Sequence, residues 1–272
     1  MSTKIAVVGL GFVGGTIYKS FEEYKLYQLG EIDLVGLDPA KGYNATYDSI
    51  KDFDAVFICV PSPMNKDGSA DTSLLESVLH ELYKASYKGV IISKVTAPPN
   101  VYQRLQKVYP NLVHVPEFLT AANAYMDYIN GTFAIIGGDV KAYVNEADRI
   151  VRITQRELHH VMHCSITEAS LAKYTINSFL ATKVLFMNEL ENLTQAAGGD
   201  WSTVRQLITL DPRIGKSHTQ VPGPDGQYGF GGMCFPKDTN ALLAYARSIG
   251  VELDVLDAAV KKNLIIRLTE PK

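Results

Sequence analysis

The chain has 272 residues, of which 46% are hydrophobic and 20% are charged. This composition supplies a packed core and excludes a disordered chain, which combines low hydrophobicity with high net charge. A formal charge of −3 argues against a protein that neutralises many phosphates, as nucleic-acid-binding proteins do. At roughly 150 residues per domain, the length predicts two domains.

The sequence contains no segment typical of a secreted or membrane protein. No apolar run approaches the roughly 18 residues of a membrane span, and the first eight residues turn directly into a strand pattern without the order of a signal peptide. The three cysteines are too few for a disulfide framework and match no zinc spacing. We therefore expect a reduced, cytoplasmic, globular protein.

Short apolar runs alternate with amphipathic stretches over the first 164 residues. The runs predicted as strands are 4–8, 32–37, 54–60, 90–93, 112–115, 133–136 and 158–164. The stretches predicted as helices are 15–29, 74–87, 101–109 and 140–153. This alternation predicts βα units on a parallel sheet.

The pattern changes near residue 165. Apolar residues at three- and four-residue spacing predict one long helix over 167–197, with further helices at 201–210, 237–249 and 253–268. Between them lies a loop rich in Gly and Pro, 211–236, and loops of this length inside a compact domain are usually functional or disordered.

A glycine-rich turn follows the first predicted strand as Gly9-x-Gly11-x-x-Gly14. In a dinucleotide site the first glycine permits the tight turn, the second lets a pyrophosphate approach the backbone, and the third permits close helix–strand packing. The following helix, with Phe12 and Val13 at its start, offers free N–H donors to phosphate. We therefore predict an α/β chain with a doubly wound Rossmann domain at 1–164, which binds a dinucleotide, and an all-helical domain at 165–272.

Asp38 ends the second predicted strand, 24 positions after Gly14, near the usual spacing of about 20. Its carboxylate would accept hydrogen bonds from ribose hydroxyls and repel a 2′-phosphate, which favours NAD over NADP. The alternative is a plain glycine-rich turn followed by a strand-ending Asp-Pro. The turn after the third strand, with Val60, Pro61 and Ser62, is expected to line the same NAD site or to be a simple turn.

Cys234 lies in the segment GFGGMCFPKD. Glycines before the cysteine leave room for a substrate, and a helix starting near Pro236 would place its N-terminus and Lys237 close to the sulfur, both of which lower a thiol pKa. Asp238 lies four residues later and could act as a base. The alternative, a buried structural cysteine, does not account for the glycines.

With this segment the sequence resembles the UDP-glucose 6-dehydrogenase/GDP-mannose dehydrogenase family. The resemblance runs from Lys4 to about residue 268, and its motifs stand in the family's order. They are VVGLGFVG (7–14), CVPSPMNKDGSADTS (59–73), KVTAPP (94–99), PEFL (116–119), LAKYTINSFLATKVLFMNE (171–189), DPRIG (211–215) and GFGGMCFPKD (229–238).

The resemblance implies a two-step, four-electron oxidation of a nucleotide sugar's primary alcohol to a carboxylate with NAD, and a helical domain like that of 6-phosphogluconate dehydrogenase. Cys234 would add to the aldehyde to give a thiohemiacetal, and then a thioester that water hydrolyses. Lys173 would stabilise negative charge on the sugar oxygen, and Asn177, one helical turn later, would help to hold it. Without the resemblance, Lys173 and Asn177 could simply lie on a solvated helix face.

The resemblance gives further residues a role. Asp238 and Thr96 would position the catalytic water or take its proton, and Glu117 would be a general base or acid. Arg213 would reach the substrate across a subunit interface, or simply pair with Asp211 on the surface. The remaining expected substrate contacts are Phe118, Leu119, Tyr228, Gly229, Gly231, Gly232 and the backbone of Pro222, Gly223 and Pro224; Thr96 and Lys237 are also expected at the cofactor.

A second group of residues looks like a metal cluster at first sight: His159, His160, His163 and Cys164. Residues 158–164 fit a strand, however, where neighbours alternate between faces, and the family has no metal there. We therefore expect no metal site. Cys59 and Cys164 are expected to be inert core thiols.

The sequence departs from the family's pattern in four places. The acidic residue expected after PEFL is Ala121, the usual Ser-Thr is Val95-Thr96, and the usual Ala-Glu before the lysine helix is Ala169-Ser170. The family's third domain, which closes over the nucleotide, is also missing, so the chain is expected to be a compact variant or a fragment with a more open substrate site.

Three functional hypotheses follow. The leading one is an NAD-dependent nucleotide-sugar 6-dehydrogenase with UDP-glucose as the default substrate; UDP-N-acetylmannosamine, UDP-N-acetylglucosamine and GDP-mannose are the alternatives. The second is a simple 3-hydroxyacid dehydrogenase, whose single hydride transfer needs no thiol. The third is a non-catalytic NAD-binding subunit. In each case we expect a homodimer, because the long helix is apolar all round, at Phe179, Leu180, Val184, Leu185, Phe186 and Leu190.

Overall fold

The computed structural model describes residues 2–27, 31–120, 122–155 and 157–269. Residues 28 and 29 of the helix predicted at 15–29, and Ala121, lie outside these residues. The chain forms two compact units. The first consists of Met1–Pro63 and Asp71–Lys173, and the second of Met64–Ala70 and Tyr174–Lys272.

The first unit is built on one sheet, whose described strands stand in the order β3-β2-β1-β4-β5-β6-β7-β8. The strands are β1 (Thr3–Val8), β2 (Ile32–Asp38), β3 (Tyr43–Asn44), β4 (Ala55–Ile58), β5 (Val90–Ser93), β6 (Leu112–His114), β7 (Phe133–Gly137) and β8 (His160–Cys164). Strands β4 and β5 are buried along their whole length, which is why they read as continuous apolar runs. The predicted Rossmann-type sheet is therefore confirmed.

The sheet is mostly parallel, as predicted, but two of its strand pairs run antiparallel. Strand β3 runs antiparallel to β2, because one 3-10 turn (Pro39–Lys41) and Gly42 with a φ of +82° reverse the chain. Strand β7 runs antiparallel to β6. In the described part of the connection between them, the one helix is the short α4 (Ala124–Ile129), and the chain re-enters the sheet from the edge at which β6 ends.

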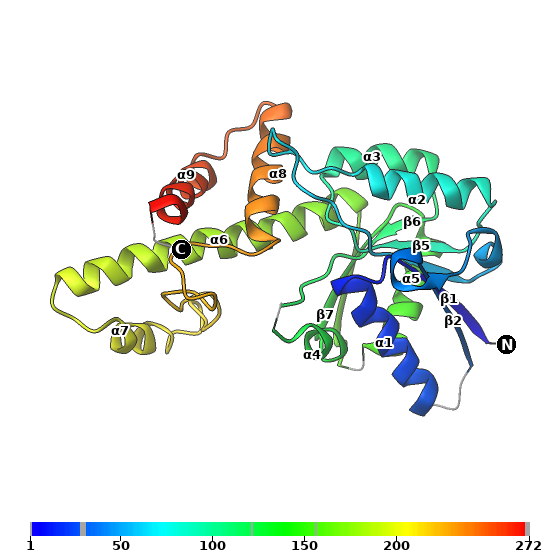
Figure 1. Ribbon diagram of the computed structural model, residues 1–272, viewed down its shortest axis with the longest axis horizontal. Helices are drawn as coiled ribbons and strands as arrows, with labels where there is room; N and C mark the ends of the chain where they lie inside the picture. Colours follow the sequence, from blue (N-terminus) through cyan, green and yellow to red (C-terminus); the bar gives the residue numbers. More distant parts are fainter. Residues whose placement is uncertain (1, 28–30, 121, 156, 270–272) are drawn as a thin grey trace. The chain divides into compact units, whose positions relative to one another are not determined.

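Helices cover both faces of this sheet (Figure 1). On one face lie α1 (Phe12–Tyr27), α4 and α5 (Lys141–Thr154), and on the other lie α2 (Ser73–Lys84) and α3 (Pro99–Val108). Successive side chains of a strand point to opposite faces of the sheet and so pack into two different cores. In β4, Phe57 packs with the first group of helices and Val56 with the second.

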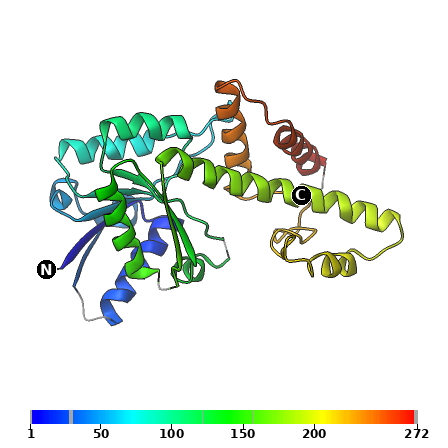
Figure 2. The ribbon, with the colours of Figure 1, turned by 180° about the vertical axis from the view of Figure 1, so that it is seen from behind.

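The second unit is helical. Its elements are most of α6 (Ile166–Ala196), which begins in the first unit, and α7 (Trp201–Ile208), α8 (Phe235–Ser248) and α9 (Asp254–Thr269). A small core joins α6, α8 and α9 through Leu185, Leu243 and Val260, and Figures 1 and 2 show α8 and α9 on one side of α6. The predicted long helix is confirmed within one residue at each end. None of the helices that the structure describes is both long and apolar enough to span a bilayer.

Candidate active site

The glycine-rich turn has the geometry that its spacing predicts. Gly9 has a φ of +82°, and a Cβ on Gly14 would stand 1.9 Å from the carbonyl oxygen of Gly9, so both positions require glycine. A Cβ on Gly11, by contrast, would meet nothing within 4 Å. The turn therefore leaves open space at its middle glycine, directly before α1 begins at Phe12, where the N–H groups at a helix start can bind phosphate.

Asp38 lies beside this turn. Its Oδ2 accepts a 2.8 Å hydrogen bond from the Leu10 backbone N–H, and Lys41 Nζ donates to the Leu10 carbonyl oxygen at 2.5 Å. Asp38 thus fixes the turn with one oxygen, and its second oxygen has no hydrogen bond among the described residues. A carboxylate with one uncommitted oxygen at this position fits a ribose hydroxyl.

The turns after β4 and β5 meet at the same edge of the sheet. The buried Ser62 hydroxyl donates to the Thr96 carbonyl oxygen at 2.8 Å, which ties the segment containing Val60 and Pro61 to the segment containing Thr96. Four of the residues predicted at the cofactor therefore lie together next to the glycine-rich turn, whose Gly9 approaches the backbone of Cys59 and Val60.

Glu117 and Lys173 form a buried ion pair. Lys173 Nζ lies 3.2 Å from Glu117 Oε1 and donates to the Glu117 backbone carbonyl oxygen at 2.5 Å. Glu117 Oε2 accepts from the Leu119 N–H at 2.9 Å, and the Lys173 ammonium lies 5.1 Å from the centre of the Phe118 ring. The structure thus brings together the predicted base and the predicted oxyanion-stabilising lysine within the first unit.

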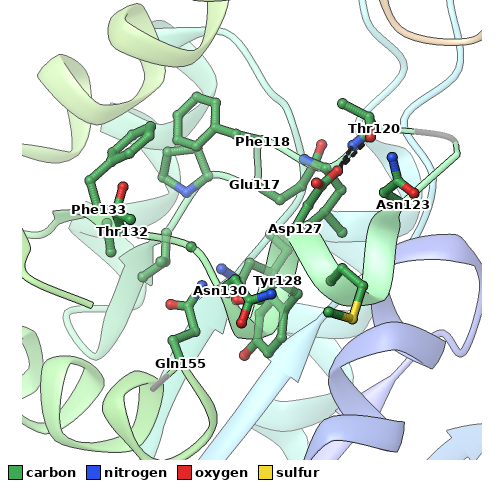
Figure 3. A pocket seen from close by; sticks show the side chains of 17 residues that line it. Glu117, Phe118, Thr120, Asn123, Asp127, Tyr128, Asn130, Thr132, Phe133 and Gln155 are labelled. Atoms are coloured by element: carbon green, nitrogen blue, oxygen red, sulfur yellow. Dashed lines mark hydrogen bonds between the residues drawn. The ribbon is translucent and has the colours of Figure 1, made fainter. Parts of the chain in front are cut away.

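A pocket of about 500 Å³ opens at the PEFL segment. Figure 3 shows Glu117 and Phe118 on its wall, with Phe133 beside Phe118 and with Asp127 bonded to Thr120. The rings of Phe118 and Phe133 are 5.0 Å apart, and Asp127 Oδ2 accepts from the backbone N–H and the hydroxyl of Thr120. Lys94 also lines this pocket. Aromatic faces with a few polar groups are typical of a ligand pocket.

Three titratable groups of the first unit have shifted pKa values: Lys94, which lines this pocket, the buried His114 and the half-buried Cys59. Burial raises the pKa of the Cys59 thiol to about 12, lowers the pKa of the Lys94 ammonium to about 8 and lowers the pKa of the His114 imidazole to about 3. Cys59 therefore stays protonated and His114 neutral at neutral pH. Burial also raises the pKa of the Cys164 thiol, and neither thiol has the character of a nucleophile.

In the second unit Cys234 is exposed and stands directly before α8, as its N-cap residue. Asp238, on the first turn of α8, is almost completely buried and accepts a 2.6 Å hydrogen bond from the Asn177 amide. Lys237 forms a 2.5 Å ion pair with the same carboxylate. The expected Lys237 ammonium is therefore directed to its neighbour Asp238, whose buried carboxylate needs a countercharge.

The glycines before Cys234 belong to a loop whose backbone is hydrogen-bonded to buried asparagines. Gly229 has a φ of +72° and donates its N–H to Asn188 Oδ1 at 2.8 Å, and a Cβ there would lie 2.4 Å from Asn263 Oδ1. Asn263 also binds both backbone groups of Phe230, at 2.7 and 3.0 Å. Sequence reasoning missed Asn188 and Asn263; the signal was a buried polar residue on a helix face that otherwise faces a core.

The predicted substrate arginine, Arg213, has an 87% exposed side chain and pairs with Asp211 through contacts of 2.6 to 3.1 Å. This is the surface pair that was the alternative at the sequence level. The backbone of the segment 214–217 is nevertheless held by Lys183, whose Nζ donates to the carbonyl oxygens of Ile214 and Ser217, both at 2.7 Å. Lys183 thus anchors the backbone of the segment that carries Arg213.

His163 of β8 and His159, which directly precedes this strand, pair with carboxylates instead of with each other. His163 Nε2 lies 3.0 Å from Asp148 Oδ2, and His159 Nε2 lies 3.4 Å from Glu157 Oε2. Within the part of the chain that the structure describes, no three His, Cys, Asp or Glu side chains are grouped to hold a metal.

The predicted catalytic residues fall into two groups. Thr96, Glu117 and Lys173 belong to the first unit, whereas Asn177 and Asp238, with Cys234 before them, belong to the second. Lys173 and Asn177 stand one turn apart on α6. Each group is assembled by contacts inside its own unit.

Two models of one protein family match the chain. The NAD binding domain of the UDP-glucose/GDP-mannose dehydrogenase family matches residues 38–155, and the family's central domain matches residues 167–264. Among curated proteins, the chain is 31% identical over 96% of its length to UDP-glucose 6-dehydrogenase TuaD of Bacillus subtilis. It is 36% identical over 79% of its length to the putative UDP-glucose 6-dehydrogenase YtcA of the same organism. The chain spans 62% and 51% of the lengths of these two relatives.

Solved structures share the fold. A UDP-glucose dehydrogenase from Pyrobaculum islandicum matches with a TM-score of 0.80 and 24% identity, over 97% of this chain and 68% of that one. A 3-hydroxyisobutyrate dehydrogenase from Mycobacterium tuberculosis matches with a TM-score of 0.75 and 16% identity, over 99% of this chain and 95% of that one. A Rossmann-type unit followed by a helical unit is thus common to both kinds of enzyme.

Proposed function

Because the chain belongs to the UDP-glucose/GDP-mannose dehydrogenase family, we propose that it is a nucleotide-sugar 6-dehydrogenase that converts UDP-glucose to UDP-glucuronate. The observation that carries this proposal is the exposed Cys234 at the start of α8, one turn before the buried Asp238 that Asn177 holds. A single alcohol oxidation needs no nucleophile, whereas oxidation to an acid is served by one that captures the aldehyde.

The residues of the first unit fit the cofactor. NAD, when bound, accepts the hydride in each of the two oxidations. The open space at Gly11 and the free N–H groups at the start of α1 would bind the pyrophosphate, and the uncommitted oxygen of Asp38 would accept from the ribose. Val60, Pro61, Ser62 and Thr96 would line the remainder of this site.

Cys234 would carry the covalent chemistry. Its sulfur adds to the aldehyde carbon, and the carbonyl electron pair becomes a hydroxyl after protonation. The second oxidation removes the hydride on that carbon and the hydroxyl proton, which leaves a thioester. Water then adds, the C–S bond breaks, and the carboxylate and the free thiol are released. The balance is one alcohol and one water consumed for one carboxylate, with four electrons removed.

Polar side chains would stabilise the charges that develop during these reaction steps. Lys173 would stabilise the oxygen that becomes negative when sulfur or water adds. Glu117, which Lys173 contacts, would take the proton of the hydrolytic water. Asp238, with Asn177, would position the reacting groups near Cys234. The nucleotide sugar would be bound by the glycine-containing loop at 229–232, the PEFL segment and Arg213.

We also propose that the chain forms a homodimer through α6. Phe179, Phe186 and Leu193 are 65%, 56% and 64% exposed, and their seven-residue spacing places them in one stripe along the helix. Of the other residues expected there, Leu185 is buried, whereas Leu180, Val184 and Leu190 are half-buried. A second copy of the stripe is a partner of matching chemistry.

The proposal is tested by incubating the protein with NAD and each candidate nucleotide sugar and identifying the product by mass spectrometry. UDP-glucuronate from UDP-glucose supports the proposal, and a uronate from UDP-N-acetylmannosamine, UDP-N-acetylglucosamine or GDP-mannose would change its substrate. Oxidation of 3-hydroxyisobutyrate alone would point to a simple hydroxyacid dehydrogenase. Bound NAD without turnover of any of these compounds would point to a non-catalytic subunit.

A further inference from the structure

Lys94 is a buried lysine to which the proposed reaction gives no role. It follows β5, only 6% of it is exposed, and it lines the same pocket as Glu117. Among the described residues its ammonium has no hydrogen bond and no ion pair within 4 Å. Lysine is almost never fully buried unless it is paired, so an ammonium in this position needs an explanation.

The groups that face Lys94 come from several elements. Burial lowers the pKa of Lys94 most. Cys59 after β4 and Glu117 after β6 raise this pKa, and Lys173 on α6 lowers it. The thiol of Cys59 and the imidazole of His114 are neutral at neutral pH, as shown above.

Asp127 on α4 also lines the pocket, but its carboxylate is committed to Thr120. Once Cys59, His114 and Asp127 are set aside, the charged groups named here that can balance one another are the ammonium groups of Lys94 and Lys173 and the carboxylate of Glu117.

Lys173 already satisfies Glu117 by direct contact, so Lys94 is surplus in the resting arrangement. The positive charge of Lys94 is needed when a substrate oxygen becomes negative. An ammonium has three donors, and Lys173 uses two of them on Glu117. If Lys173 shares its charge with a substrate oxygen, Glu117 needs another cation nearby, since a buried carboxylate without a countercharge is costly.

We propose that Lys94 is a positioning residue: it is the standing countercharge of Glu117, which leaves Lys173 free to serve the negative oxygen of the substrate. This role rests on the proposed function, because it acts through two residues of the proposed reaction. It is distinct from contact with the substrate, and it requires only that Lys94 stays charged in the pocket that Glu117 also lines.

The first test needs no turnover. Competitive acetylation with acetic anhydride across pH, read by mass spectrometry, gives the pKa of Lys94 in the intact protein. We expect about 8 in the unmodified chain, a lower pKa in Glu117→Gln and a higher one in Lys173→Met. If neither substitution moves the titration of Lys94, the three groups are not coupled and the inference is wrong.

The second test is kinetic. Lys94→Met keeps the shape but removes the charge, and we expect it to lower kcat at least about tenfold with little change in KM, because the charge is needed only when the oxygen becomes negative. Lys94→Arg should retain most of the activity. It should also remove the fall in kcat above pH 8, because a guanidinium stays charged there.

Lys107→Met, on the exposed side of α3, is the control for the loss of one lysine, and it should behave as the unmodified protein. A merely structural role predicts the opposite order, with the larger Lys94→Arg more damaging than Lys94→Met. Equal activity of Lys94→Met and the unmodified protein would overturn the inference while the proposed function stands. If the unmodified protein oxidises no nucleotide sugar, the proposed function fails, and the acetylation titration alone decides the charge coupling.

Discussion

The Asn177 amide donates a 2.6 Å hydrogen bond to the Asp238 carboxylate, although 61 residues separate them along the chain. Both side chains are buried, and Lys237 supplies the countercharge at 2.5 Å. The contact joins α6 to the first turn of α8, directly after Cys234. Residues that we expect to act in catalysis thus also connect two helices of the second unit.

Removal of this contact should destabilise the protein. Asn177→Ala leaves a buried carboxylate with one fewer donor, and we expect the free energy of unfolding to fall by about 1–3 kcal/mol. Urea unfolding followed by the fluorescence of Trp201, which lies in the same unit, measures it. Asn100→Ala, at an exposed position, is the control. Equal stability of the two variants would show that the hydrogen bond contributes nothing.

The stability of the first unit should depend on pH through His114. Its imidazole has a folded pKa of about 3 against an ordinary value of 6.5, because it is buried. Between these values the unfolded chain binds a proton that the folded chain does not, so stability is fully present above pH 6.5 and falls as the pH is lowered, by about 1.4 kcal/mol per unit.

Urea unfolding between pH 4 and 7, followed by circular dichroism, measures this dependence. His114→Gln should flatten it, whereas His80→Gln, at an exposed position, should leave it unchanged. An unaltered slope in His114→Gln would assign the pH dependence to other groups.

Asp38 should set the choice between NAD and NADP. Asp38→Asn keeps an oxygen acceptor for the Leu10 N–H but removes the negative charge, so the glycine-rich turn should persist while repulsion of a 2′-phosphate is lost. Calorimetry measures the dissociation constants of NADP and of NAD. We expect the ratio of the NADP constant to the NAD constant to fall at least about tenfold, or about 1.4 kcal/mol. A ratio that stays constant would mean that other groups exclude NADP.

The stripe on α6 should control assembly. Phe186→Glu puts a charge in the middle of the proposed interface, and sedimentation should show a monomer. Tyr83→Glu, which changes an equally exposed aromatic residue on α2, is the matched control and should leave the dimer intact. A dimer that persists in Phe186→Glu must use another surface.

The order and type of most elements could be predicted from the sequence, because buried parallel strands read as apolar runs and α6 is long and periodic. Strand direction could not be predicted at β7, since it depends on the edge at which the preceding connection runs. Helix α4 has six residues, too few to show a helical period.

The candidate site divides in the same way. The conformations of Gly9 and Gly14 could be predicted from their spacing, and the position of Cys234 before a helix from its neighbours, whereas the role of Cys234 stays a prediction. The partners of Lys237 and Lys94 could not be, since these depend on which groups folding buries beside them: Asp238 takes the Lys237 ammonium, and the pocket wall covers Lys94. Asn188 and Asn263 were missed because their partners are backbone groups of a distant loop.

The most direct test of the central claim is the number of NADH molecules formed per molecule of UDP-glucose consumed, measured by absorbance with limiting sugar. We expect two NADH molecules per molecule of sugar, with UDP-glucuronate as the product. Cys234→Ser should abolish net formation of the acid, because an alcohol in place of the thiol is a poor nucleophile and a poor leaving group. A stoichiometry of one, or full two-NADH turnover in Cys234→Ser, would contradict a two-step oxidation through Cys234.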